Sequence, residues 1–136
     1  MDNQIMTWPV EKSVFDEALN AAREKSDRVR EATSPVDELP PDGLYVLSRD
    51  WQSGYGVTKD DELIGLFSLV PGRGEAMVNE ATGFDGAIKL DCFDGFLPGF
   101  YARFGFVEYK REPNWTEGGP DVVYMKLDNE LSPLVS

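Results

Sequence analysis

The stretch Leu90–Phe106, LDCFDGFLPGFYARFGF, constrains the fold more than any other part of the sequence. Residues 90–93 are mostly apolar and have the composition of a strand, and Asp94-Gly95 interrupts them. Pro98 is tolerated in the first turn of a helix, and Gly105 can adopt the left-handed conformation that ends one. The stretch therefore predicts a strand, a turn, a short helix and the start of a further strand.

The rest of the chain predicts an amphipathic helix followed mainly by strands. Apolar residues recur at helical spacing between Val10 and Ala22, and the charged run 24–31 either extends this helix or starts a second one. Ile5-Met6 has the composition of an edge strand. Further strands are expected at 43–49, 54–58, 62–70, 87–93, 106–111 and 122–127, with 54–58 and 62–70 forming an antiparallel hairpin, and a short helix is expected at 76–81.

This order of elements predicts an α/β fold with a single domain over residues 1–136, in which a mixed, mostly antiparallel sheet is flanked by helices. The length suits one domain and is short for two. No apolar run approaches the roughly 20 residues of a membrane span, and the N-terminus lacks the basic and apolar regions of a signal peptide. We therefore expect a soluble, cytoplasmic protein with no membrane partner.

The thiol and imidazole content limits the possible chemistry. The sequence contains no histidine and one cysteine, Cys92. An internal disulfide is therefore excluded, a metal site is not expected, and no Ser-His or Cys-His pair can supply a nucleophile. Cys92 lies within a predicted buried strand, where a cysteine usually behaves as a small apolar residue. Proton transfer would have to use carboxylates, tyrosine, lysine, cysteine or water.

The chain is strongly acidic. Its 13 basic and 25 acidic residues give a formal net charge of −12. Direct nucleic-acid binding is not expected, because the phosphate backbone requires clustered lysine and arginine. The charge is compatible with a cationic substrate or partner, with imitation of a polyanion, and with a role in solubility alone.

The end of the opening stretch resembles a known family signature. Tyr101-Ala-Arg-Phe-Gly105-Phe106 resembles the Y-x-x-x-G-F motif that closes the penultimate helix of GNAT N-acetyltransferases. Ile64-Gly65 resembles the start of a central strand in the same family, and the order of elements is similar from the first helix to the last strand. The resemblance implies transfer of an acetyl group from acetyl-CoA to an amine.

The resemblance also implies a place for the acyl donor, beside the strand 62–70. The following turn and helix would hold the pyrophosphate, which requires successive backbone N–H groups and a helix N-terminus directed at the anion. Gly74 and Ala76 match the last two positions of the family's loop pattern, Pro71 occupies the first, and Arg73 is a candidate substitute for the usual basic residue. The implied binding residues are Leu69, Val70, Gly72, Arg73, Gly74 and Ala76. The alternative is a plain glycine-rich turn that starts a helix.

Tyr101 matches the tyrosine that protonates the leaving coenzyme A thiolate in many family members. A phenol with a pKa of about 10 stays neutral at physiological pH and can deliver that proton. For the general base, the resemblance implies a carboxylate or a water chain, and Glu62, Asp91 and Asp94 lie on or beside the relevant strands. Each residue also has a structural interpretation: Tyr101 as part of an aromatic core, Asp91 as a buried acid satisfied by hydrogen bonds, and Asp94 as a helix cap.

Three functional hypotheses follow. The first is an N-acetyltransferase whose acceptor is a small-molecule or protein amine, with the acidic surface favouring a cationic acceptor. The second is a catalytically degenerate acidic protein that binds and inhibits a host protein, in the manner of a nucleic-acid mimic, because strings such as LDCFDG and PNWT resemble proteins of bacteriophages and mobile elements. It would act in the host cytoplasm. The third is a structural subunit that dimerises through edge strands, although the sequence does not define an oligomeric state.

Overall fold

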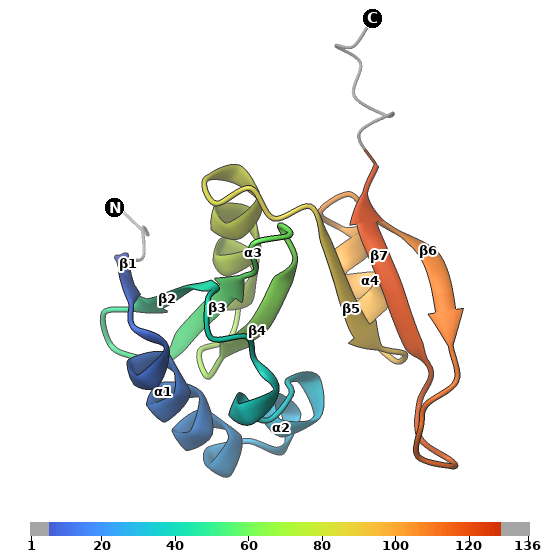
Figure 1. Cartoon of the computed structure of the whole chain (residues 1–136), viewed down its shortest axis with the longest axis horizontal. Helices are drawn as coiled ribbons and strands as arrows, with labels where there is room; N and C mark the ends of the chain where they lie inside the picture. Colours follow the sequence, from blue (N-terminus) through green and yellow to red (C-terminus); the bar gives the residue numbers. More distant parts are fainter. Residues whose placement is uncertain (1–5, 129–136) are drawn as a thin grey trace, which may run out of the picture. The chain divides into compact units, whose positions relative to one another are not determined.

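The chain divides into two compact units, Met1–Ala87 and Ile88–Ser136, of which the computed structural model describes residues 6–128 (Figure 1). Each unit contains one sheet, and all strand pairs in both sheets are antiparallel within the described residues. The predicted α/β class with mainly antiparallel strands flanked by helices is confirmed. The strands are divided between two sheets, of four and three strands.

The first unit contains most of the helices and the four-stranded sheet, in the order β1-β2-β3-β4. Its elements are β1 (Thr7–Val10), α1 (Lys12–Lys25), α2 (Asp27–Ala32), the 3-10 helix η1 (Val36–Glu38), β2 (Leu44–Ser48), β3 (Ser53–Val57), β4 (Leu63–Ser68) and α3 (Arg73–Gly83).

The start of the chain differs from its prediction. The edge strand is Thr7–Val10 rather than Ile5-Met6, and Ile5 lies outside the described residues. Pro9 is compatible with this strand because β1 is at the edge of the sheet, where a missing N–H need not break a hydrogen bond. The charged run forms the separate helix α2, since Ser26 takes an extended conformation and its hydroxyl accepts a hydrogen bond from the Val29 N–H at 3.2 Å.

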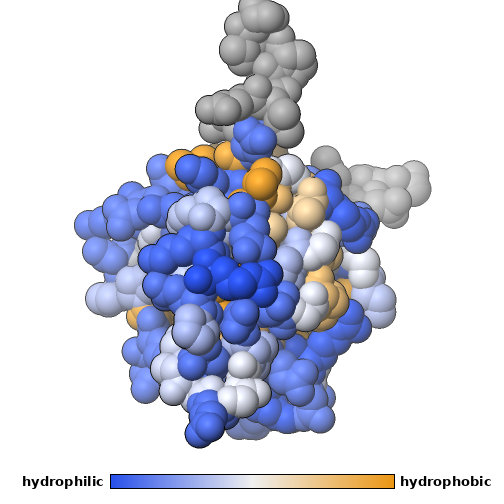
Figure 2. Space-filling model, turned by 90° about the vertical axis from the view of Figure 1, so that its right-hand side faces the viewer, coloured by the Kyte–Doolittle hydropathy of each residue, from blue (hydrophilic) through white to orange (hydrophobic). Residues whose placement is uncertain are grey.

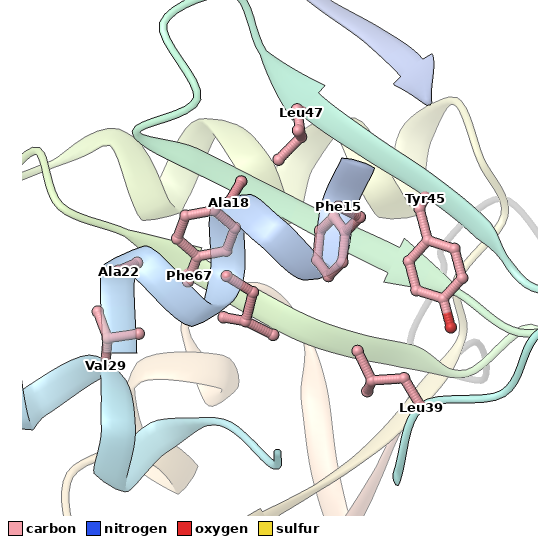
Figure 3. Close-up of a cluster of buried hydrophobic side chains, with 9 residues drawn as sticks. Phe15, Ala18, Ala22, Val29, Leu39, Tyr45, Leu47 and Phe67 are labelled. Atoms are coloured by element: carbon pink, nitrogen blue, oxygen red, sulfur yellow. The ribbon is translucent and has the colours of Figure 1, made fainter. Parts of the chain in front are cut away.

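The main core of the first unit lies between α1 and one face of the sheet (Figure 3). Phe15 is fully buried, and its ring centroid lies 4.9 Å from that of Tyr45 and 5.9 Å from that of Phe67. The buried members of the cluster are Phe15, Ala18, Leu19, Ala22, Val29, Leu39, Tyr45, Leu47 and Phe67. Their helical spacing on α1 and alternate spacing on β2 follow the predicted amphipathic pattern.

The predicted hairpin of β3 and β4 is confirmed, with an irregularity in the middle. The register shifts between Gly54 and Gly56, so that two residues of β4 lie opposite one of β3. Gly65 occupies this bulge with φ +61°, and a Cβ there would lie 3.2 Å from the Phe15 ring. The bulge therefore depends on a glycine at this position.

Helix α3 is attached to the sheet by polar side chains near its C-terminal end. The hydroxyl of the buried Tyr55 donates to Glu80 at 2.7 Å and also contacts Asp85, and the Thr7 hydroxyl donates to Glu80 at 2.7 Å. Burial raises the pKa of Tyr55, and the adjacent carboxylates add to the shift. Met77, together with other buried residues of α3, also packs inward. These contacts fix the helix whose N-terminus is considered below.

The second unit contains β5 (Lys89–Phe93), α4 (Leu97–Ala102), β6 (Phe106–Glu112) and β7 (Val122–Leu127), with strand order β5-β7-β6. The prediction for the opening stretch is confirmed: Pro98 lies in the first turn of α4, and Gly105 follows the helix with φ +96°. The expected cap is wrong. Phe96 holds the N-cap position without a side-chain hydrogen bond, and Asp94 instead pairs with Arg111 at 2.8 Å.

Figure 2 shows the side of the second unit on which β6 lies, and its surface is mainly hydrophilic. This agrees with β6, where every residue after Phe106 is exposed. A small hydrophobic area lies close to where the described chain ends. None of the helices in residues 6–128 is long and apolar enough to span a membrane. The same residues contain no group of three or more cysteine, aspartate or glutamate side chains arranged to hold a metal ion.

Candidate functional site

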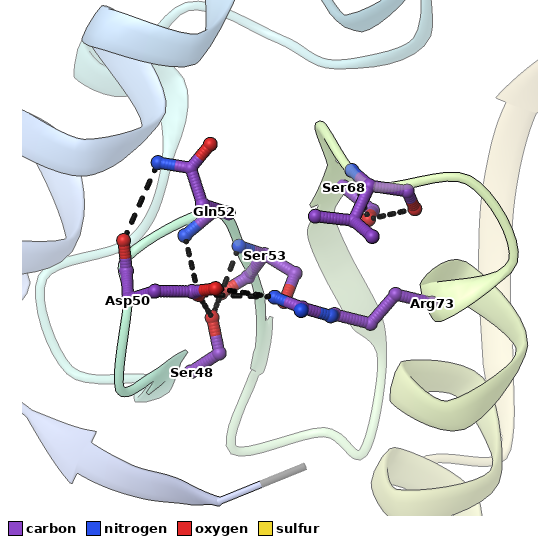
Figure 4. Close-up of polar contacts among 7 residues, drawn as sticks. Ser48, Asp50, Gln52, Ser53, Ser68 and Arg73 are labelled. Atoms are coloured by element: carbon purple, nitrogen blue, oxygen red, sulfur yellow. Dashed lines mark hydrogen bonds and ion pairs between the residues drawn. The ribbon is translucent and has the colours of Figure 1, made fainter. Parts of the chain in front are cut away.

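The turn between β4 and α3 contains the residues predicted to hold the phosphates, and local hydrogen bonds define its shape (Figure 4). The Leu69 N–H donates to the Gln52 carbonyl at 2.7 Å, which joins the turn to the β2–β3 connection. The Ser68 hydroxyl accepts from the Val70 N–H at 3.1 Å and donates to the Val70 carbonyl at 2.8 Å. Leu69 and Val70, the first residues after β4, are half-buried.

Helix α3 begins at Arg73, three residues before the predicted start at Ala76. Gly72 is the N-cap with φ +82°, a conformation that favours glycine, and a Cβ there would meet no atom within 4 Å. The Arg73 N–H donates a hydrogen bond to the Val70 carbonyl at 3.2 Å. Gly74 follows at the second position of the helix, and the first N–H groups of an α-helix have no carbonyl of a preceding helical turn to donate to.

This helix N-terminus has the backbone arrangement that binds anions. The helix dipole places partial positive charge there, and the glycines keep side chains away from the N–H groups. Gly72, Arg73, Gly74 and Ala76 form the N-cap and first turn of this helix, and their role in holding a cofactor stays a prediction. Glu75 lies in the same first turn and adds a negative charge that an anionic ligand would have to tolerate.

Arg73 forms an ion pair that the sequence did not predict. Its Nη1 donates to both carboxylate oxygens of Asp50 at 3.0 Å, across 23 positions of sequence. Asp50 also accepts from the Ser48 hydroxyl at 2.7 Å and from the Gln52 N–H at 3.1 Å. Partial desolvation opposes ionisation of Asp50, but these hydrogen bonds and the Arg73 charge lower its pKa to about 2. No local sequence signal connects Asp50 to the turn.

In the second unit, Tyr101 is buried among aromatic rings. Its ring centroid lies 5.1 Å from that of Phe100 and 6.0 Å from that of Phe106. Burial raises the pKa of Tyr101, and the nearby Cys92 and Asp91 raise it further. The phenol therefore holds its proton at neutral pH. The aromatic cluster that the sequence offered as an alternative is present, and it is compatible with a proton-donating hydroxyl.

Asp91 is exposed, so its interpretation as a buried acid satisfied by hydrogen bonds is wrong. β5 is an edge of the three-stranded sheet, and Asp91 lies opposite Tyr124 of β7. A shielded environment still raises the pKa of the Asp91 carboxyl through desolvation. The charge of Asp91 in turn raises the pKa of Tyr101 and of the Cys92 thiol.

Glu62 lies at the opposite end of β4 from the turn at 69–72. It belongs to the β3–β4 turn, where its N–H donates to the Thr58 hydroxyl at 3.1 Å and its carbonyl accepts from the Thr58 N–H at 2.9 Å. The structure therefore does not bring Glu62 together with Arg73 and its neighbours. Its role as a base stays a prediction.

Cys92 is buried, as expected for a small apolar residue in β5. Burial raises the pKa of its thiol to about 12, and the charge of Asp91 adds to the shift. Alkylation by iodoacetamide near neutral pH is therefore expected to be at least about tenfold slower in the native protein than in concentrated urea, because the thiolate is the reactive form. Mass spectrometry of timed samples measures this. Equal rates in the two conditions would show that Cys92 is accessible and ionisable in the fold.

Comparisons with known proteins show a likeness at the level of structure. No protein-family model matches the chain, and no match was found among curated proteins. A GCN5-related N-acetyltransferase from Brucella melitensis is similar with a TM-score of 0.60 and 13% sequence identity, covering 98% of this chain and 79% of that chain. A putative N-acetyltransferase from Lactobacillus plantarum is similar with a TM-score of 0.60 and 15% identity, covering 91% of this chain and 98% of that chain.

These likenesses show that the chain has the fold of GCN5-related N-acetyltransferases. The fold implied by the Tyr101–Phe106 signature is therefore confirmed. The narrower resemblance to proteins of bacteriophages and mobile elements stays a prediction.

Proposed function

We propose that the protein is an N-acetyltransferase that transfers an acetyl group from acetyl-CoA to the amine of a cationic acceptor. The observation that carries this proposal is the N-terminus of α3, where Gly72 at the N-cap has no atom near its Cβ position and Arg73 opens the helix, an arrangement that suits a phosphate. The shared fold supports it, because the two solved structures reported above are described as acetyltransferases.

The first unit would bind the phosphates of the donor. The backbone N–H of Gly74 would donate to a phosphate oxygen, and Arg73 would add a charge-assisted hydrogen bond. Leu69 and Val70 would lie beside the apolar part of the donor. The carboxylates of Glu75 and Asp50 oppose an anion, so the guanidinium has to provide the local positive charge.

The second unit would supply the groups that move protons. Acetyl-CoA provides a thioester carbonyl that an amine can attack, with formation of the C–N bond and cleavage of the C–S bond. Tyr101 would donate its proton to the leaving sulfur, and the raised pKa keeps that proton in place until it is needed. Asp91 would accept the proton lost by the attacking amine, a role that its raised pKa favours.

The proposed acceptor is cationic because of the overall charge of the chain. A formal net charge of −12 attracts positively charged molecules and raises their concentration near the surface. The acceptor is then a small polyamine-like molecule or a lysine-bearing protein segment. Steady-state rates with such acceptors should fall as salt is added, because screening weakens this attraction.

Replacing Arg73 with alanine is the direct test of the phosphate site. A hydrogen bond to a charged group contributes about 1.5 to 3 kcal/mol, so the Kd for acetyl-CoA should rise roughly 10-fold to 100-fold. Isothermal titration calorimetry measures the affinity. Lys59→Ala is the matched control, since Lys59 is an exposed cation of the same unit that pairs with Asp42 at 3.4 Å.

The control should bind acetyl-CoA like the unmodified protein. If the unmodified protein gives no heat with acetyl-CoA at millimolar concentration, the acetyltransferase proposal fails. That result is the one expected for the degenerate inhibitor considered from the sequence. Equal affinities of Arg73→Ala and the unmodified protein would instead remove Arg73 from the phosphate site.

A further inference from the structure

The ion pair between Arg73 and Asp50 leaves part of the guanidinium available. Both contacts to Asp50 are made by one nitrogen, Nη1. Within residues 6–128, the Nε and Nη2 atoms of Arg73 have no acceptor. An arginine can use this edge to bind a phosphate through two parallel hydrogen bonds. The ion pair thus holds the Arg73 side chain through Nη1 alone and does not use Nε and Nη2, the pair of donors best suited to a phosphate.

Asp50 is itself held in place by hydrogen bonds from its neighbours in the chain, Ser48 and Gln52. The Ser48 hydroxyl and the Gln52 N–H both donate to its Oδ1, so the carboxylate is fixed by two hydrogen bonds besides the ion pair. Figure 4 shows Arg73 extending from α3 toward this carboxylate. The Arg73 side chain is only 19% exposed, although it carries a charge. A long, flexible cation is therefore ordered before any ligand arrives.

Ser53 is linked to Asp50 through the hydroxyl of Ser48. Ser53 is fully buried, and its Oγ has no hydrogen-bond partner in the described structure. Ser53 is the register partner of Ser68, the residue that precedes the turn to α3. The Ser53 N–H donates to the Ser48 hydroxyl at 3.2 Å, so the backbone of Ser53 helps to fix the hydroxyl that holds Asp50.

We propose that Asp50 is a positioning residue that fixes Arg73 so that its Nε and Nη2 atoms bind a phosphate group of the donor. This inference rests on the proposed function. Asp50 acts through Arg73 and does not touch the ligand. Its negative charge opposes an anion, but binding to an ordered guanidinium avoids the loss of rotamer freedom that a mobile arginine would suffer. Positioning is therefore expected to outweigh repulsion.

Positioning of Arg73 and repulsion of the anion predict opposite changes in the Kd for acetyl-CoA when Asp50 is replaced with asparagine. Asparagine keeps an oxygen that can accept from Ser48 and Gln52, and it removes the charge that holds Arg73. If Asp50 positions Arg73, the Kd for acetyl-CoA should rise about tenfold, as expected when a preorganised contact is loosened. If Asp50 only repels the anion, the Kd should fall.

A double-mutant cycle decides whether the effect passes through Arg73. Calorimetry with acetyl-CoA is carried out on the unmodified protein, Asp50→Asn, Arg73→Ala and the double variant. We expect Asp50→Asn to weaken binding in the unmodified background and to change it less than about twofold in the Arg73→Ala background. Equal weakening in both backgrounds, or tighter binding in the unmodified one, would overturn the proposal.

Two controls separate positioning from general damage to the fold. Asp42→Asn removes an exposed carboxylate of the same unit that pairs with Lys59, and it should leave the Kd for acetyl-CoA unchanged. S-acetylpantetheine lacks the phosphates, so Asp50→Asn should not change kcat/KM for this donor. A parallel loss with both donors would assign Asp50 a structural role. If the unmodified protein does not bind acetyl-CoA, the proposed function fails. If it binds and the cycle shows no coupling, only this inference fails.

Discussion

Tyr101→Phe is expected to lower kcat for acetyl transfer about 100-fold, since loss of a general acid typically reduces the rate by at least this factor. Phenylalanine keeps the ring that packs against Phe100 and Phe106, so the buried cluster should persist. Only the hydroxyl is removed, and the leaving thiolate would then have to take its proton from water. Steady-state rates at saturating acetyl-CoA measure the effect.

The design of this experiment separates proton transfer from binding. The KM for acetyl-CoA should stay within about twofold, because Tyr101 is not among the residues predicted to contact the phosphates. Tyr109→Phe is the matched control, since Tyr109 is a half-exposed tyrosine of β6. It should leave kcat unchanged. A fall in kcat of less than threefold for Tyr101→Phe would show that Tyr101 is only a core residue.

The pH profile should depend on Asp91. A general base works only when it has lost its proton, so the rate should rise with pH through the pKa of Asp91. Desolvation raises that pKa above the ordinary value for an aspartate, and the rise should therefore occur at higher pH than for an exposed carboxylate. Asp91→Asn should remove this limb of the profile. The limb would persist unchanged if another group, such as Glu62, were the base.

Local sequence rules predicted the elements with strong turn signals. Pro98 and Gly105 bound α4 because proline suits the first helical turn and glycine accepts the left-handed conformation after the last one. The hairpin of β3 and β4 was predicted because two apolar strands flank a short polar turn. In each case the physical cause lies within a few residues of the element that it determines.

Features set by distant residues were missed. The apolar composition of β5 does not show that the strand lies at an edge of its sheet. In the order β5-β7-β6 its partner is β7, which begins at Val122, far along the chain. Asp91 is exposed because it points to the face opposite that of its buried neighbours Leu90 and Cys92. The ion pair between Arg73 and Asp50 joins the start of α3 to the connection between β2 and β3. The sequence around each residue gives no indication that the other is its partner. The start of α3 was misplaced because Gly74 is equally suited to a loop and to a first helical turn.

Phe15→Ala is expected to lower the free energy of unfolding by about 3 to 5 kcal/mol, the usual range for a buried phenylalanine truncated in a core. Phe15 is fully buried between α1 and the sheet, and its ring packs against Tyr45 and Phe67. Alanine would leave a cavity beneath the β4 bulge, because the Phe15 ring is the nearest group to Gly65. The neighbouring backbone cannot close such a cavity without changing the hairpin.

Urea unfolding followed by circular dichroism measures this loss, and Phe84→Ala is the matched control. Phe84 is 86% exposed at the end of α3 in the same unit, so its truncation should cost less than about 0.5 kcal/mol. A cost below about 1 kcal/mol for Phe15→Ala would contradict the packing described here. The prediction also bears on the proposed site, because β4 leads directly from the bulge to the turn before α3. Acetyl-CoA should therefore stabilise the Phe15→Ala variant less than the unmodified protein at equal concentration, since a distorted turn binds phosphate more weakly.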